Sequence, residues 1–184
     1  MKLYTIPNIL TLARIALIPI FVIVFFLPFK GSNYVVACIF LLAAITDWLD
    51  GFLARKLKQF SPFGEFLDPV ADKLVVAAAL VLLVMAYPTW WMTLASIVVV
   101  SREIVISALR EWMADLGRRH TVKVSMLGKV KTTVQMVALL LLLISAPHYS
   151  TLTYWGLSLL WIAVILTLWS MCIYLKAAWV SIQD

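Results

Sequence analysis

The chain has 184 residues, of which 64% are hydrophobic and 13% are charged, and its mean hydropathy is +1.03. Soluble globular domains are about half apolar and about one-quarter charged, so this composition excludes an ordinary soluble domain. The sequence instead predicts an all-α integral membrane protein with one membrane-embedded domain, residues 1–184, and about six spanning helices. Membrane lipids are therefore expected partners, and nucleic acid is not.

The N-terminal segment, residues 1–14, is predicted to be a short interfacial helix. Pro7 suits the first turn of a helix, while Lys2 and Arg14 are expected to mark its water-facing side. Asn8 and Arg14 are its candidate functional residues. Their side chains could serve either as anchors at the head-group level or as contacts to a substrate.

Uncharged or nearly uncharged runs separated by polar breaks predict the spanning helices. The predicted spans are residues 15–29, 34–50, 66–87, 90–112 and two more between 131 and 176. A basic loop around residues 55–58 is expected between the second and third spans, and a longer basic stretch, 113–131, before the fifth.

Basic residues are distributed unevenly between the two sides of this predicted bundle. Only Lys30 of the 15 lysines and arginines falls in an outer turn, and all nine acidic residues lie on the opposite side. Positively charged loops face the cytoplasm, so both termini and the acidic segment are expected there. A transporter would be expected to carry ionisable groups near the bilayer midplane. In this chain the ionisable residues cluster at one interface, which favours chemistry on lipid head groups instead.

Four aspartates lie among the apolar segments, at intervals that place each pair on one face of a helix. Asp47 and Asp50 are three residues apart and Asp68 and Asp72 are four apart, so each pair projects from one face of a helix. Two such helices side by side would bring four carboxylates together, and these would repel one another unless neutralised. All-oxygen ligands suit hard cations, so the pattern indicates a pair of divalent ions such as Mg2+, Mn2+ or Ca2+.

The same stretch carries a longer motif, D-x2-D-G-x2-A-R-x8-G-x3-D-x3-D. Its eight positions are occupied by Asp47, Asp50, Gly51, Ala54, Arg55, Gly64, Asp68 and Asp72. The chain thereby resembles the CDP-alcohol phosphotransferase family. The resemblance implies a six-helix membrane fold, two divalent cations, Mg2+ or Mn2+, as cofactors, and a homodimer.

The resemblance also implies roles for individual residues. Asp47, Asp50 and Asp68 would be the main metal ligands, and Asp72 would be the general base while also contacting a metal. The expected CDP-binding residues are Asn8, Gly51, Arg55 and Gly64. The glycines would allow close approach of either the nucleotide or a neighbouring helix. The Arg55 guanidinium could pair with the diphosphate, or serve as a cytoplasmic-side anchor.

A second set of cations indicates where a phosphate-bearing acceptor could bind. Arg102 and Arg110 are eight residues apart, about two helical turns, and Lys129 and Lys131 open the fifth span. Arg102 follows an apolar run, where an arginine is costly without an anionic partner. The alternative is that these cations bind lipid phosphates and neighbouring glutamates.

Four segments extend the resemblance over almost the whole chain: IPNILTLARI, TDWLDGFLAR, SREIVISALREWMADLG and SMLGKVKTTVQM. They are similar to the bacterial inner-membrane branch of the family that joins CDP-diacylglycerol to sn-glycerol 3-phosphate. The implied products are phosphatidylglycerophosphate and CMP, in phosphatidylglycerol and cardiolipin biosynthesis. Serine, inositol phosphate or phosphatidylglycerol as the acceptor remain alternatives, as does a divalent-metal transporter.

Overall fold

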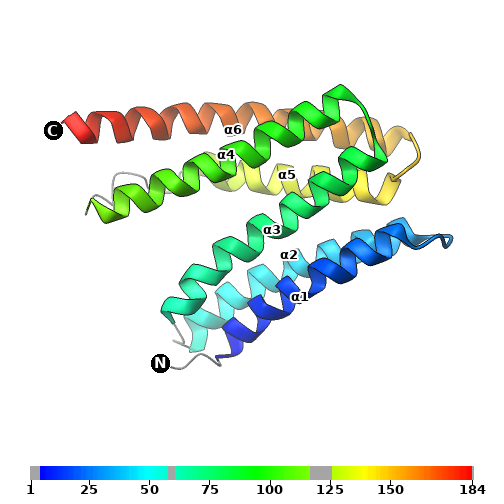
Figure 1. Ribbon diagram of the computed structural model, residues 1–184, viewed down its shortest axis with the longest axis horizontal. Helices are drawn as coiled ribbons and strands as arrows, with labels where there is room; N and C mark the ends of the chain where they lie inside the picture. The colour runs from blue at the N-terminus through cyan, green and yellow to red at the C-terminus, as the bar shows by residue number, and fades with distance from the viewer. Residues whose placement is uncertain (1–4, 58–60, 117–125, 184) are drawn as a thin grey trace. The chain divides into compact units, whose positions relative to one another are not determined.

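The computed structural model describes residues 5–57, 61–116 and 126–183, and every regular element in these ranges is an α-helix (Figure 1). The helices are α1 (Ile6–Phe26), α2 (Ser32–Leu57), α3 (Pro62–Ala86), α4 (Trp90–Asp115), α5 (Met126–Ser145) and α6 (Thr151–Gln183). Within the described residues, five helices are long and apolar enough to cross a bilayer, and α5 adds a shorter apolar stretch, Val130–Ser145. The all-α membrane fold predicted from composition is thus confirmed.

The chain divides into two compact units. The N-terminal unit comprises Met1–Ala86 and Leu143–His148, and the C-terminal unit comprises Tyr87–Leu142 and Tyr149–Asp184.

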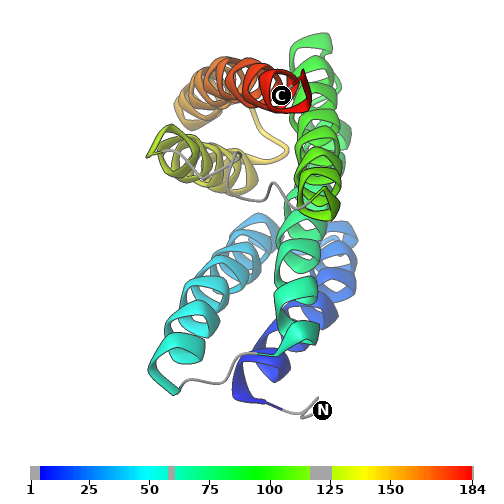
Figure 2. The ribbon, with the colours of Figure 1, turned by 90° about the vertical axis from the view of Figure 1, so that its left-hand side faces the viewer.

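In the N-terminal unit, α1, α2 and α3 lie side by side (Figures 1 and 2). Their shared core is built from aromatic and aliphatic side chains, with the rings of Phe21 and Phe40 6.3 Å apart. Fully buried alanines, such as Ala71 and Ala79, allow the helix backbones to approach closely. This packing holds the acidic segments of α2 and α3 beside the first turns of α1.

In the C-terminal unit, α4 packs along α6 through a core that includes Ile106, Met113 and Tyr174. Helices α5 and α6 also approach closely. A Cβ added to Gly156 of α6 would lie 2.8 Å from Cγ of Leu142 on α5, so only glycine fits there without movement.

Three predicted boundaries, and the predicted placement of Arg14, differ from the structure. Residues 6–14 are not a separate interfacial helix, because α1 runs without interruption to Phe26. Arg14 does not mark a water-facing side, since its side chain is 1% exposed and pairs with aspartates. The segment around Arg55 is the last part of α2 rather than a loop, and α3 begins at Pro62, four residues before the predicted start.

Candidate active site

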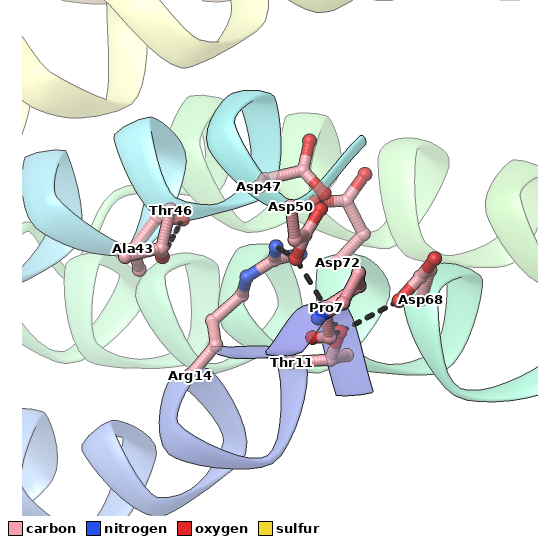
Figure 3. Close-up of polar contacts among 9 residues, drawn as sticks. All are labelled: Pro7, Thr11, Arg14, Ala43, Thr46, Asp47, Asp50, Asp68 and Asp72. Carbon is pink, nitrogen blue, oxygen red and sulfur yellow. Dashed lines mark hydrogen bonds and ion pairs between the residues drawn. The ribbon is translucent and has the colours of Figure 1, made fainter. Parts of the chain in front are cut away.

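Three helices of the N-terminal unit contribute polar side chains to one cluster (Figure 3). Helix α2 supplies Asp47 and Asp50, helix α3 supplies Asp68 and Asp72, and helix α1 places Arg14 between them. The helical spacing therefore does bring the four aspartates predicted from the sequence to one place.

Arg14 is the centre of this cluster. Its Nη1 donates to Asp47 Oδ1 at 2.6 Å, its Nη2 donates to Asp50 Oδ2, and its Nη1 lies 3.6 Å from Asp72 Oδ1. The guanidinium is almost fully buried, and so is Asp50, whose side chain is 3% exposed. A buried charge of either sign is costly alone, so each stabilises the other. One planar cation thus neutralises part of the charge of three carboxylates.

Thr11 links the remaining aspartate to the same helix. Its hydroxyl donates to Asp68 Oδ1 at 2.7 Å and lies 3.3 Å from Asp50 Oδ2. Thr11 precedes Arg14 by three residues, so both side chains project from one face of α1. Asp72 differs from the buried members of the cluster, because its side chain is 57% exposed. It is therefore accessible to a molecule arriving from outside the helices.

Asn8, one further turn back on α1, lies against the beginning of α3. Its Nδ2 donates to Ser61 Oγ at 2.9 Å, and the same hydroxyl caps α3 by accepting from the Gly64 N–H at 3.0 Å. A Cβ on Gly64 would lie only 2.5 Å from Asn8 Oδ1, whereas a Cβ on Gly51 would meet no described atom within 4 Å. Gly64 thus accommodates a neighbouring protein side chain, while Gly51 faces open space.

This contrast predicts opposite results for two alanine substitutions. Gly64→Ala should destabilise the protein by about 1–3 kcal/mol, because the buried, hydrogen-bonded Asn8 must move. Gly51→Ala should leave the stability of the folded protein unchanged or raise it by up to about 1 kcal/mol, because alanine favours a helix more than glycine does. Thermal unfolding in detergent would measure both, and equal destabilisation would contradict the assignment.

The donor set of this site fits hard divalent cations. Its anionic groups are all carboxylates, and the Thr11 hydroxyl is a further oxygen donor. In this arrangement three carboxylates contact Arg14, while Asp68 accepts from Thr11. Within the described ranges no three Asp, Glu, His or Cys side chains converge as a ligand set. Binding of metal would therefore require the carboxylates to turn away from the guanidinium.

Two residues predicted to bind substrate lie only partly within the described structure. Arg55 belongs to α2 and Lys129 to α5, but both side chains fall outside the described part of the chain.

The other predicted acceptor-site cations belong to the C-terminal unit. Arg102 and Lys131 are buried and share one anion: Arg102 Nη1 donates to Glu103 Oε1 at 2.6 Å, and Lys131 Nζ donates to it at 3.3 Å. The Arg110 guanidinium lies 5.5 Å from the centre of the Tyr174 ring. The structure therefore brings together two of the predicted cations, with a glutamate between them.

Thr11 is not among the site residues predicted from the sequence, and Arg14 is predicted only as a substrate contact or an anchor. A signal was present, however. Asn8, Thr11 and Arg14 recur at intervals of three on an otherwise apolar helix, and a charge in such a helix requires a partner inside the protein.

These features define a multi-pass helical membrane protein with a cluster of carboxylates between three of its helices. Residues 4–169 match the family model described as CDP-alcohol phosphatidyltransferase, and the chain belongs to this family. It is 56% identical over 175 residues to a CDP-diacylglycerol–glycerol-3-phosphate 3-phosphatidyltransferase of Salmonella paratyphi A, covering 95% of each chain. It is 54% identical over 181 residues to the protein of that name from Escherichia coli K12, covering 98% of each chain.

Proposed function

We propose that this chain transfers the phosphatidyl group of CDP-diacylglycerol to sn-glycerol 3-phosphate, giving phosphatidylglycerophosphate and CMP. The observation that carries this proposal is the identity of 54–56%, over nearly the full length, to relatives named for that reaction. The match spans both units, so the acidic cluster and the buried cations belong to one family region.

The proposed reaction is a displacement at the phosphorus that carries diacylglycerol. The free primary hydroxyl of glycerol 3-phosphate attacks this phosphorus, the bond to the CMP oxygen breaks, and the hydroxyl proton passes to a base. Asp72 is the proposed base, because its side chain is the most exposed of the three carboxylates that pair with Arg14. Asp47, Asp50 and Asp68 would hold Mg2+ or Mn2+, which when bound offset charge on the diphosphate.

The remaining side chains of the proposed site bind and orient substrate. Gly51 leaves space for the nucleotide, while Arg55 is the proposed partner of the diphosphate. In the C-terminal unit, Arg102 and Lys131 are the proposed contacts for the acceptor phosphate, with Arg110 and Lys129 as further candidates. An anionic acceptor suits this unit because its two buried cations share a single glutamate and carry excess positive charge.

The proposal extends to orientation and assembly. Both termini and the acidic cluster would face the cytoplasm of a bacterial inner membrane, as the basic residues favour. The protein would act as a homodimer, as its family resemblance implies.

CMP release by the purified chain in mixed micelles tests this function. Release from CDP-diacylglycerol is expected only with both glycerol 3-phosphate and Mg2+ or Mn2+, and EDTA should abolish it. Serine, inositol phosphate and phosphatidylglycerol serve as comparison acceptors. Release with one of these alone would reassign the product, and release that persists in EDTA would overturn the metal dependence. Divalent-cation flux into vesicles without CMP release would support a transporter instead.

A further inference from the structure

Three buried polar atoms of the C-terminal unit have no hydrogen-bond partner among the described residues. They are Arg102 Nε on α4, Gln135 Oε1 on α5 and Thr167 Oγ1 on α6. All three side chains are at least nine-tenths buried, with exposures of 5%, 3% and 0%. Buried polar groups are nearly always satisfied, so unpartnered atoms on three neighbouring helices point to a polar ligand.

Hydrogen bonds link Arg102 to both of the other helices that carry these atoms. Arg102 Nη2 donates to Ser170 Oγ at 3.1 Å, and the Ser170 hydroxyl donates to the Thr167 carbonyl at 2.9 Å. Lys131 joins the same group through Glu103. Gln135 follows Lys131 by four residues, so the two side chains share a face of α5.

The direction of the helices places the side chains of Gln135 and Thr167 on the same side of the two cations, Arg102 and Lys131. Helices α5 and α6 are joined by only a few residues and run antiparallel, side by side in Figure 1. Moving from Lys131 to Gln135 along α5 and from Ser170 to Thr167 along α6 therefore leads the same way, toward the connection. Each step is about one helical turn, about 5 Å, which the three-carbon chain of a polyol phosphate can span.

Resting on the proposed function, we propose that Gln135 and Thr167 select the acceptor by binding its second hydroxyl. With the acceptor phosphate on Arg102 and Lys131, the C2 hydroxyl of sn-glycerol 3-phosphate donates to Gln135 Oε1, while Thr167 Oγ1 donates to the oxygen of that hydroxyl. An acceptor that lacks this hydroxyl leaves two buried polar atoms unsatisfied. A site built in this way rejects such an analogue strongly, since the penalty falls on the protein groups.

The test compares sn-glycerol 3-phosphate with 3-hydroxypropyl phosphate, which keeps the attacking hydroxyl and the phosphate but lacks the C2 hydroxyl. The unaltered full-length chain should use the analogue with a kcat/KM at least about tenfold lower. Gln135→Met should lower kcat/KM for glycerol 3-phosphate by about tenfold, mainly through KM, and leave the value for the analogue unchanged. Thr167→Val, a change of similar volume, should act in the same direction.

Thr133→Val is the matched control, because Thr133 is exposed on the same helix α5. It should preserve the preference for glycerol 3-phosphate, and the KM for CDP-diacylglycerol should be unchanged in all variants. Equal losses with both acceptors in the Gln135 and Thr167 variants would overturn the assignment, as would equal use of both acceptors by the unaltered chain. Absence of CMP release from the unaltered chain with either acceptor would instead overturn the proposed function itself.

Discussion

Arg14→Met should lower the stability of the metal-free protein more than any other single substitution of a cation in the N-terminal unit. It removes the partner of Asp50, which is 3% exposed, and leaves a buried carboxylate beside three others. Breaking a buried ion pair from one side typically costs about 3–5 kcal/mol. Thermal unfolding in detergent with EDTA would show this as a lower midpoint temperature. Lys56→Ala is the control, since Lys56 is an exposed cation of α2.

The same variant should respond differently to divalent cations. In the unaltered chain an ion must compete with the guanidinium for Asp47 and Asp50, whereas in Arg14→Met it would meet uncompensated carboxylates. Mg2+ or Mn2+ should therefore raise the unfolding temperature of Arg14→Met more than that of the unaltered chain. An equal rise in both proteins, or a stability in EDTA equal to that of Lys56→Ala, would show that Arg14 is not the counter-ion of this cluster.

Asp72→Asn should abolish most turnover while leaving the substrate-binding site in place. Its side chain is the most exposed of the three that pair with Arg14, 57% compared with 40% for Asp47 and 3% for Asp50, and its contact to Arg14 is longer, at 3.6 Å. Loss of a general base typically lowers the rate by about 10²–10⁴-fold. The kcat for CMP release is expected to fall by that factor, while stabilisation of the protein by CDP-diacylglycerol with Mg2+ is retained.

Asp115→Asn is the matched control for this substitution, because Asp115 is an exposed carboxylate at the end of α4. It should leave kcat unchanged. Near-normal turnover in Asp72→Asn would remove Asp72 as the base. Loss of ligand-induced stabilisation together with turnover would assign it to binding instead.

The aspartates could be predicted from sequence because their information is local. Spacings of three and four residues define one face of a helix, and apolar runs around them define the helices. The paired carboxylates of α2 and α3 are accordingly found together. The basic segment predicted between the second and third spans does separate α2 from α3, although α2 continues through Arg55 because nothing in LARKL opposes a helix.

The partners of the aspartates could not be predicted in the same way, because they depend on contacts between distant segments. Arg14 lies 33 and 36 residues before Asp47 and Asp50, and a single arginine near an N-terminus also suits a position at the membrane surface. Burial decides between these alternatives, and it is a property of packing. Glu103 is a similar case. The sequence shows that Glu103 is next to Arg102, but it does not show that Lys131 of α5 contacts the same carboxylate.

The position of Arg14 also bears on how the protein enters the membrane. An arginine near the middle of a spanning helix opposes insertion by about 2.5–3.5 kcal/mol, so α1 alone is a poorer insertion signal than its apolar sequence implies. Among the described residues its charge is compensated by Asp47, Asp50 and Asp72, all of which the ribosome adds more than 30 residues later. Helices α1 and α2 are therefore expected to integrate best as a hairpin, in which Asp47 and Asp50 are assembly partners of the leading helix.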